Sequence, residues 1–501
     1  MNPPRPALTR TALTRTALTS TALTRAALIV VASLIALCEP GRPSFAAQAA
    51  PFAPPALLHS IATQRLPPAA VSFLVVDTET GRTVAGLNLD TPRSPASTVK
   101  ILTTYASLDM LGPAYTWRTR ALLRGTLDNG TLDGDLILQG GGDPYMTIER
   151  WWSFARALRT RGLTSIHGNI LIDNTQFSVE QTDRGAFDGQ PNRNYNVLPD
   201  ALMVNFQNIE FRLFANSTTR KVEIIADPQP QNLIIDNRVR FSTGRCRGPS
   251  RRVDFGVDAH DANHVSFTGA LSPDCEPRSF NRVLMTPADY AFGTFVTLWR
   301  QLGGEFDGQE VLAPVPAEAR PFLSFDSLSL AEIVRLTNKF SSNLMARHLL
   351  LTLGVEKFGP PATARKGAQA IEDWSRQRGL SLADLDIDNG SGLSRSTRVT
   401  VTELADVLNS AYHSRYSAEF LSSLPLAGMD GTLRARMREA PAGAVRLKTG
   451  HLNAVSGIAG FVTSNSGRTY IVVSLVNHLR ADFGAGEPVH AALVDWVLEN
   501  L

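Results

Sequence analysis

The length and composition of the chain exclude several classes of protein. With 501 residues, of which 43% are hydrophobic and 19% charged, it is too long for one ordinary core and too apolar to be disordered. Its 49 Lys and Arg against 46 Asp and Glu leave a net charge of +3, which provides no general attraction for nucleic acid or an anionic membrane. We therefore expect two or more domains that act on a small molecule or a peptide.

The amino terminus is typical of a secretory signal. Residues 1–25 carry a degenerate Ala-Leu-Thr-Arg repeat without acidic residues, and residues 26–38 form an uncharged apolar stretch. This stretch has the length of a signal-peptide core and falls short of the roughly 20 residues that span a bilayer. Residues 1–49 are therefore predicted to be a leader that is removed on export to the periplasm or cell envelope. An uncleaved anchor helix is the alternative, and loose membrane association is left open.

The predicted elements change in type along the chain. A strand hairpin over 71–90 is followed by a helix over 96–111. Short strands separated by Gly, Asn and Asp turns then dominate, with one helix among them at 148–161; these strands cover 118–123, 134–138, 166–172, 221–226, 233–241 and 264–270. The remainder is mostly helical and ends with two strands and a last helix; its elements are predicted at 288–302, 328–353, 364–379, 401–412, 456–463, 468–476 and 488–500.

This order of elements predicts the domain organisation. Helices and strands of one kind lie on both sides of a β-rich middle, which indicates one domain split by a long insertion. We expect an α/β (α+β) fold in which residues 50–115 and 286–501 form the discontinuous catalytic domain. Residues 116–285 form the mostly β accessory insertion.

The cysteines predict one cross-link. Removal of the leader takes Cys38 away and leaves Cys246 and Cys275. In an exported protein an even number of cysteines indicates a disulfide, with two unpaired buried thiols as the alternative. These two cysteines lack a cluster of His residues and make a poor zinc site, so we expect no metal.

The first motif that carries chemistry is Ser97-Thr98-Val99-Lys100, at the start of a predicted helix. Residues three apart on a helix share a face, so the Ser97 hydroxyl lies within reach of the Lys100 amine. A desolvated lysine beside other cations can accept the proton that a serine must lose to become a nucleophile. The chain has only six lysines, and an apolar helix follows Lys100. Both facts favour a catalytic pair over a capping serine followed by a solvated lysine.

The second motif is Ser341-Ser342-Asn343, near or within a predicted helix. A hydroxyl and an amide two residues apart at a helix break can point into one cleft. Ser341 could pass a proton there, and Asn343 could bind a substrate amide. By itself the segment also fits an ordinary helix N-cap.

The third motif, Lys448-Thr449-Gly450, lies in a segment that alternates apolar and basic positions, as a strand with one solvated face does. Lys448 and Thr449 offer a cation and a hydroxyl to a carboxylate. Gly450 allows another backbone to approach closely. A solvated edge strand is the alternative.

Taken together, S-x-x-K, S-x-N and K-T-G in this order resemble the signature of the penicillin-recognising serine enzymes. The long separation of the first two motifs resembles that of the class C low-molecular-mass penicillin-binding proteins, the D-alanyl-D-alanine carboxypeptidase/endopeptidases. Local phrases are similar to this family as well; they cover residues 134–144, 198–206, 388–395 and 428–433. Ser342 and His451 depart from the family pattern.

The resemblance implies a β-lactamase/transpeptidase-like serine acyl-enzyme domain without a cofactor. It would act on peptidoglycan stem peptides and cross-links, and β-lactam antibiotics would inhibit it covalently. Ser97 would attack the carbonyl between two D-alanines, and Lys100 would accept its proton. Ser341 would pass a proton to the leaving group while Lys448 holds the polarity of that hydroxyl.

The same resemblance implies substrate-binding residues. Asn343 would bind the substrate backbone, and Thr449, with Gly450 beside it, would bind the terminal carboxylate. The backbone N–H groups of Ser97 and His451 would stabilise the oxyanion. Two further residues, Asp143 and Arg395, match family positions near the diamino-acid side chain of the stem peptide. Alternatively, Asp143 caps a turn and Arg395 forms a surface ion pair.

Two other functions compete with this hypothesis. One is a β-lactamase or esterase on the same scaffold, which the long insertion disfavours. The other is a non-enzymatic cell-wall-binding protein with a degenerate site. The presence of all the catalytic groups named above disfavours that alternative.

Overall fold

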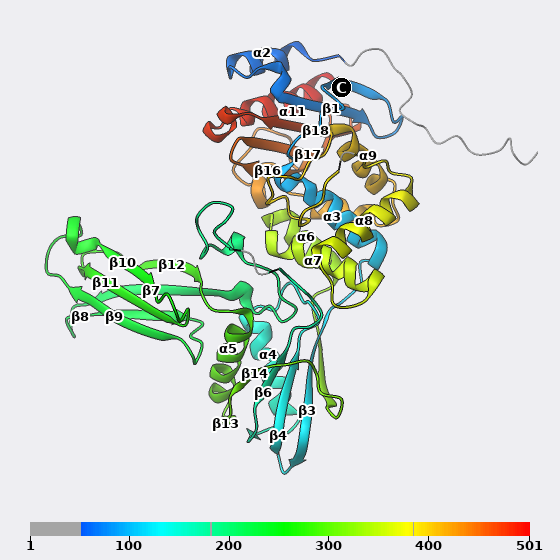
Figure 1. Ribbon diagram of the computed structural model, residues 1–501. Coiled ribbons are helices and arrows are strands. Elements are labelled where there is room, and N and C mark those ends of the chain that lie inside the picture. The colour runs from blue at the N-terminus through cyan, green and yellow to red at the C-terminus, as the bar shows by residue number, and fades with distance from the viewer. Residues whose placement is uncertain (1–51, 181–182, 384) are drawn as a thin grey trace, which may run out of the picture. The chain divides into compact units, whose positions relative to one another are not determined.

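The computed structural model describes residues 52–180, 183–383 and 385–501 (Figure 1). The predicted leader, residues 1–49, lies outside these ranges. No helix within the described ranges has both the length and the apolar character that a membrane crossing requires.

A five-stranded antiparallel sheet brings the two ends of the described chain together, in the order β16-β17-β18-β1-β2. Its strands are β1 (Val71–Asp77), β2 (Thr83–Leu87), β16 (Val445–Leu452), β17 (Val455–Thr463) and β18 (Thr469–Asn477). β1 pairs with β18 along its whole length, with Val71 opposite Val476 and Asp77 opposite Tyr470. The early hairpin is therefore completed by strands from the end of the chain.

Helices cover both faces of this sheet (Figure 1). One face packs against α2 (Pro55–Thr63) and α11 (Gly486–Asn500). The other face packs against a helical layer that consists of α3 (Lys100–Leu111), α6 (Leu330–Phe340), α7 (Asn343–Phe358), α8 (Ala364–Arg378), α9 (Val401–Tyr412) and α10 (Ser417–Ser423). Because β1 is buried on both sides, Phe73 faces the first core and Leu74 the second. Burial on both faces explains why β1 reads as a continuous apolar run.

The structure corrects the predicted single helix over 328–353. α6 ends at Ser341, whose φ of 57° lies in the left-handed region, and α7 begins directly after Ser342. The Ser342 side chain caps α7 by accepting a hydrogen bond from the N–H of Met345. Apolar residues continue through both helices, so periodicity alone did not reveal the break.

A second group of elements forms a sheet with central order β13-β5-β4-β3-β15, to which β6 and β14 are added. The strands are β3 (Arg118–Asp128), β4 (Thr131–Gln139), β5 (Ser165–Ile166), β6 (Ile170–Asp173), β13 (Glu305–Phe306), β14 (Glu310–Leu312) and β15 (Arg320–Asp326). Two helices, α4 (Ile148–Thr160) and α5 (Pro287–Gln301), pack against it. Trp151 of α4 meets Phe295 of α5 edge to face.

Two three-stranded sheets complete the accessory region, in the orders β10-β11-β9 and β12-β7-β8. Their strands are β7 (Asn208–Asn216), β8 (Lys221–Asp227), β9 (Ile234–Phe241), β10 (Val253–Val257), β11 (His264–Leu271) and β12 (Arg278–Val283). A cluster of aromatic rings lies between the sheets, namely Phe211, Phe255, Phe267 and Phe280. The sequence analysis did not predict β7, β10, β12, β13, β14 or β15, although β7 and β10 alternate polar and apolar residues.

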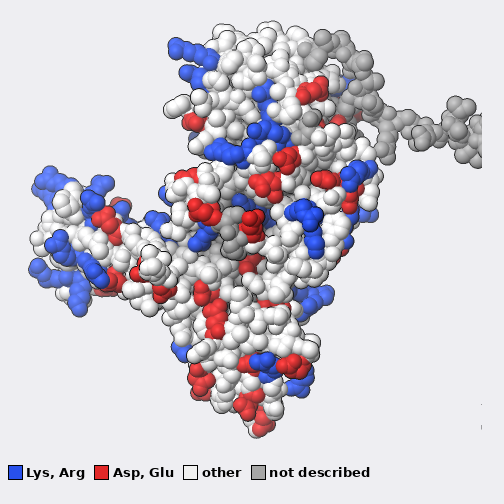
Figure 2. All heavy atoms as spheres, in the orientation of Figure 1, with Lys and Arg blue, Asp and Glu red and all other residues white. Residues whose placement is uncertain are grey.

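Basic side chains gather over these two small sheets (Figure 2); the exposed arginines of this part include Arg238, Arg240, Arg245, Arg247, Arg251 and Arg252. The loop that carries most of them also carries Cys246. The structure joins Cys246 to Cys275 in a disulfide, with 4.9 Å between their Cα atoms. A cross-link here restrains a loop of like charges that has little apolar surface to bury.

The pairing of three strands, β13, β14 and β15, indicates where the inserted region ends. β15 pairs with β3, and β13 and β14 pair with β5 and β6. Residues 287–326 therefore share a sheet and a core with the accessory elements. We propose that the inserted part extends to about Asp326, beyond the predicted limit at residue 285. The mixed architecture confirms the predicted α/β (α+β) class with a sheet-rich insertion.

Candidate active site

The Ser97 side chain stands on a short 3-10 turn, Ala96–Val99, which leads directly into α3. Two glycines pack closely against the backbone of this turn. A Cβ added to Gly450 of β16 would lie 2.6 Å from the carbonyl oxygen of Pro95, and one added to Gly392 would collide with the carbonyl oxygen of Ala96. Ala96 itself has a φ of 46°, which is rare for a residue with a Cβ. The turn is thus confined between two closely fitting backbone segments, and Ser97 on it is half-buried.

The Lys100 ammonium group is fully buried and has three neighbours. Its Nζ lies 2.7 Å from Ser97 Oγ, 2.8 Å from Asn343 Oδ1 and 2.5 Å from the backbone oxygen of Ser391. The last two atoms can only accept hydrogen bonds. A neutral amine has two N–H bonds and one lone pair, so these acceptors take both N–H bonds and leave the lone pair facing the Ser97 hydroxyl. As an ammonium, Lys100 donates to all three atoms; as a neutral amine, it keeps the two pure acceptors and turns its lone pair to Ser97.

Electrostatics favour this neutral form. Burial, together with the positive charges of Lys448 and Arg347, holds the pKa of Lys100 well below its usual value. The exposed fraction of Lys100 is 0%. A lysine whose charged form is disfavoured is available as a base near neutral pH.

Ser341 faces a second buried lysine. Lys448 of β16 donates from Nζ to Ser341 Oγ over 2.9 Å and to the backbone oxygen of Thr449 over 2.6 Å. Burial, and then the nearby Arg436, lowers the pKa of Lys448 to about 7. The left-handed backbone of Ser341 at the break between α6 and α7 brings its hydroxyl to this lysine. The two motifs that contribute Ser341 and Lys448 thus meet, although they are far apart in the sequence.

Thr449 makes a contact that the sequence did not indicate. Its hydroxyl lies 2.7 Å from the hydroxyl of Thr432, which belongs to the 428–433 phrase noted in the sequence. The loop that carries Thr432 is held by the Asp430 carboxylate, which pairs with the buried Lys339 at 2.7 Å. Gly431 packs against the backbone of Lys339 in turn. The end of α6 therefore positions both Ser341 and the loop beside Thr449.

Asn343 contacts both Lys100 and the accessory region. Its Oδ1 binds Lys100, while its Nδ2 donates weakly, over 3.4 Å, to the backbone oxygen of Tyr195. These contacts fix which side of the Asn343 amide faces Lys100, because only the amide oxygen can accept a hydrogen bond from the lysine. His451 is exposed on β16 opposite Ser456, one residue beyond Gly450.

Arg395 lies on the rim of a cavity of about 800 Å³. The exposed Arg395 guanidinium lies 4.4 Å from the centre of the Phe187 ring and donates over 3.3 Å to the backbone oxygen of Asn453. Asp183 and Arg347 also line this cavity. Sequence reasoning singled out only Arg395 of this lining as a site residue. Other lining residues lie in the phrases 198–206 and 388–395 that resemble the family, namely Leu198, Pro199, Asp388, Asn389, Leu393 and Ser394.

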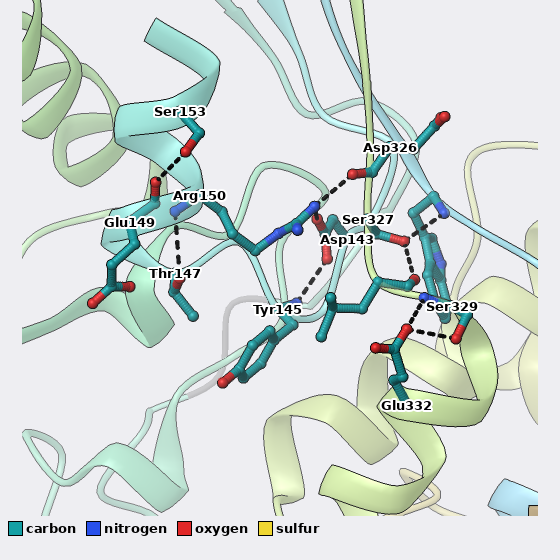
Figure 3. A network of polar contacts seen from close by, with 12 residues as sticks. Asp143, Tyr145, Thr147, Glu149, Arg150, Ser153, Asp326, Ser327, Ser329 and Glu332 are labelled. Carbon is teal, nitrogen blue, oxygen red and sulfur yellow. Dashed lines mark hydrogen bonds and ion pairs between the residues drawn. The ribbon is translucent and has the colours of Figure 1, made fainter. Parts of the chain in front are cut away.

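The partners of the Asp143 carboxylate are Tyr145 and Arg150, both in the accessory region (Figure 3). Its exposed fraction is 2%, one carboxylate oxygen accepts from the N–H of Tyr145, and the other lies 3.9 Å from Arg150 of α4. Arg150 also donates over 2.5 Å to the backbone oxygen of Asp326. Burial raises the pKa of Asp143 to about 6. None of these partners belongs to the catalytic group, so the contacts of Asp143 suit a structural role where β15 leads into α6.

Comparison with known proteins now identifies the family. A family model described as the D-Ala-D-Ala carboxypeptidase 3 (S13) family matches residues 56–499. The chain belongs to this family. The resemblance inferred from the three motifs is thereby confirmed.

Relatives of this carboxypeptidase match most of its length. It is 26% identical over 419 residues to the D-alanyl-D-alanine carboxypeptidase DacB of Haemophilus influenzae, which covers 83% of this chain and 87% of that protein. It is 28% identical over 452 residues to a D-alanyl-D-alanine carboxypeptidase of Actinomadura sp., at 86% and 81% coverage. The crystal structure of penicillin binding protein 4 from Haemophilus influenzae matches with a TM-score of 0.74 at 25% identity, over 88% of this chain and 99% of that one.

These matches confirm the predicted activity. The chain is a serine-type D-alanyl-D-alanine carboxypeptidase. They support the peptidase hypothesis and give no support to the β-lactamase or esterase alternative.

Proposed function

We propose that this carboxypeptidase works through an acyl-enzyme on Ser97, with Lys100 as the base. The observation that carries the proposal is the set of three contacts around Lys100 Nζ, which leaves one direction for a lone pair and aims it at Ser97 Oγ. Ser97 Oγ attacks the carbonyl carbon between two D-alanines, and its proton moves to Lys100. The backbone N–H groups of Ser97 and His451 are proposed to hold the oxyanion.

Collapse of the tetrahedral intermediate requires a proton for the departing amine. Ser341 is proposed to supply it; the support is that Lys448 donates to the Ser341 oxygen, which leaves the Ser341 O–H free to turn toward the substrate. The C–N bond then breaks, D-alanine leaves, and water hydrolyses the ester on Ser97. The Ser341 hydroxyl is restored by the proton that Lys100 took at the first step, passed through the same cluster.

The terminal carboxylate of the substrate is assigned to Thr449 and Lys448. The Thr449 hydroxyl donates to Thr432 in the absence of substrate and is proposed to turn its O–H to the carboxylate, which the Lys448 charge attracts. Asn343 Nδ2 has only a weak partner and is proposed to bind the substrate backbone. Arg395 at the cavity rim is proposed to meet the diamino-acid side chain of the stem peptide. Buried Asp143 has no comparable access.

The same site is proposed to cleave peptidoglycan cross-links and to react covalently with β-lactams. Both reactions use the same attack of Ser97 on an acyl group beside a carboxylate. The penicillin binding protein 4 that resembles this chain has been solved in complex with a β-lactam. The family assignment makes the protein an enzyme of the cell envelope, and we propose that residues 1–49 direct its export to the periplasm.

Labelling and product release test the proposed function together. Purified protein is expected to retain fluorescent penicillin through denaturing electrophoresis, and to release D-alanine from an N-acetylated peptide ending in D-Ala-D-Ala. Heat-unfolded protein is the control for nonspecific labelling. A folded chain that acquires no adduct and releases no D-alanine would contradict the proposal, and rapid loss of the adduct would favour a β-lactamase.

The lowered pKa of Lys448 predicts an alkaline limit to activity. Because the pKa of Lys448 is near 7, the group is charged below this pH and neutral above it. The attraction for the substrate carboxylate should therefore disappear as the pH rises through about 7, and kcat/KM for an N-acetylated peptide should fall with it. Measured from about pH 5 to about pH 9, Lys448→Met should start lower and lose this alkaline limb. An unchanged limb in Lys448→Met would assign it to another group.

A further inference from the structure

Basic side chains collect at one end of the two small accessory sheets (Figure 2). Three segments form this end, namely 217–221, 240–252 and 272–278, and we call them together the arginine tip. The arginine tip contains two acidic residues, Asp274 and Glu276. Its eight basic residues are all exposed; they are Arg220, Lys221, Arg240, Arg245, Arg247, Arg251, Arg252 and Arg278. The net charge of +3 for the whole chain does not reveal this strongly basic surface.

Contacts between the three segments make the arginine tip one surface. The disulfide described above joins the second segment to the third. Arg278 of the third segment also donates from Nη1, over 2.7 Å, to the backbone oxygen of Arg251 in the second. The Arg220 guanidinium of the first segment lies 5.6 Å from the centre of the Phe241 ring in the second. The fold therefore keeps these positive charges together, although like charges repel one another.

Most charges of the arginine tip have no counter-ion on the protein. Within the described ranges, Arg252 is the one basic residue of the tip that forms an ion pair, with Asp254 at 3.2 Å. A surface with several unpaired charges of one sign attracts molecules of the opposite charge. Arginine in particular presents its donors as a fork that matches a carboxylate. The arginine tip therefore suits a partner that carries several anionic groups.

The arginine tip lies at the free ends of the strands. β7 leads into it and β12 leads out of it, so the small sheets join the rest of the chain at the opposite end, where Asn208 pairs with Val283. β7 has nine residues, which places the tip about 27 Å from that end. The opposite strand ends carry acidic residues instead, namely Asp227, Asp258 and Asp261. The positive charge is thus confined to the end that is free to meet a partner.

The activity of the family indicates what this partner is. A D-Ala-D-Ala carboxypeptidase acts on peptides that end in a carboxylate. In peptidoglycan many such peptides are attached to one polymer, so the polymer displays many carboxylates. Several weak contacts to one polymer add up, and they raise the concentration of stem peptides around the bound enzyme. The charge of the arginine tip is therefore complementary to the charge of the polymer that carries the substrate peptides.

We propose that the arginine tip binds carboxylates of the peptidoglycan polymer and holds the enzyme on it. The inference rests on the proposed function, because it takes peptidoglycan as the polymer on which the enzyme acts. It assigns a binding surface to the accessory sheets, to which none of the three motifs contributes.

Cosedimentation with insoluble peptidoglycan tests the proposal. Wild-type protein is expected to sediment with the polymer at about 50 mM NaCl and to be released at about 500 mM, because salt screens exposed charges. The triple variant Arg240→Gln, Arg245→Gln, Arg247→Gln should bind about tenfold more weakly or worse. These three side chains are exposed and lie outside the hydrophobic core, so the fold should persist. Converting the carboxyl groups of the peptidoglycan to amides should likewise abolish most of the wild-type binding.

The matched control loses the same charge outside the accessory sheets. It is the triple variant Arg65→Gln, Arg82→Gln, Arg415→Gln, which alters three exposed arginines and should bind peptidoglycan as wild type does. Both variants should keep kcat/KM for a soluble N-acetylated peptide ending in D-Ala-D-Ala within about twofold of wild type, because none of the six residues belongs to the catalytic group. On insoluble peptidoglycan, the tip variant alone should release D-alanine more slowly.

Three results would overturn this inference. The first is equal binding of peptidoglycan by the tip variant and the control. The second is wild-type binding that persists at high salt or on amidated peptidoglycan. The third is tighter binding of the wild type to anionic phospholipid vesicles or to DNA than to peptidoglycan, which would assign the tip to a membrane or to a nucleic acid. A wild-type enzyme that takes up no penicillin and releases no D-alanine from the soluble peptide would overturn the proposed function instead.

Discussion

Ser97→Ala is expected to abolish both the penicillin adduct and the release of D-alanine. The substitution removes the Oγ atom that would form the ester, and no other described hydroxyl lies against Lys100 Nζ. The fold should persist, because Ser97 is only partly buried and its side chain serves none of the core contacts. Electrospray mass spectrometry after incubation with benzylpenicillin measures the adduct directly, and a coupled D-amino-acid oxidase assay measures D-alanine.

Ser341→Ala is the matched comparison, since it removes the other hydroxyl that contacts a buried lysine. It should still acquire the adduct, more slowly than wild type, because the proposed role of Ser341 is proton delivery. The assignment of the nucleophile fails if Ser97→Ala acquires covalent penicillin while Ser341→Ala does not. Unchanged thermal unfolding of both variants would confirm that the comparison concerns chemistry.

Lys100→Met is expected to slow acylation by about 10²–10⁴-fold, the usual contribution of a general base. Methionine has a similar length and is suited to a buried position, so the α3 packing should survive. The change leaves Asn343 Oδ1 and the backbone oxygen of Ser391 without their donor, which costs about 1–3 kcal/mol for each buried acceptor. Stopped-flow acylation rates with a chromogenic β-lactam give the rate effect, and thermal unfolding gives the stability effect.

Lys357→Met is the control for this substitution. It removes a lysine that pairs with Asp373 on the surface, outside the catalytic group, so the acylation rate should match that of wild type. If Lys100→Met acylates as fast as the control, the base must be a different group. In that case the contacts around Lys100 Nζ would have a structural function only.

The sequence was sufficient to predict that Ser97 and Lys100 meet, for a local reason. Ser97 and Lys100 are three residues apart on one turn, so helix geometry alone brings the hydroxyl to the amine. The motifs around Ser341 and Lys448 indicated a hydroxyl and a cation of the types that acyl transfer requires. Their joint occurrence implied the family, which the matched family model confirms. Strands such as β1 were also predictable, because a run of apolar residues shows that both faces are buried.

Other features depended on contacts between segments that are distant in the sequence. The break between α6 and α7 is set by a left-handed Ser341, and apolar periodicity does not report a single dihedral angle. The pairing of β15 with β3 moves residues up to Asp326 into the accessory sheets, and pairing partners are not encoded in either strand alone. Asp143 is a third example: the resemblance to the family suggested a role for this residue, but it indicated neither that its side chain is buried nor that Arg150 lies beside it.

The sequence by itself determined which groups can react, because the residue types and their short spacings are local properties. Tertiary structure alone decided the partners of those groups and the direction in which their pKa values shift. Lys100 has a lowered pKa because folding removes water from it and brings Lys448 and Arg347 near it, from segments far away along the chain.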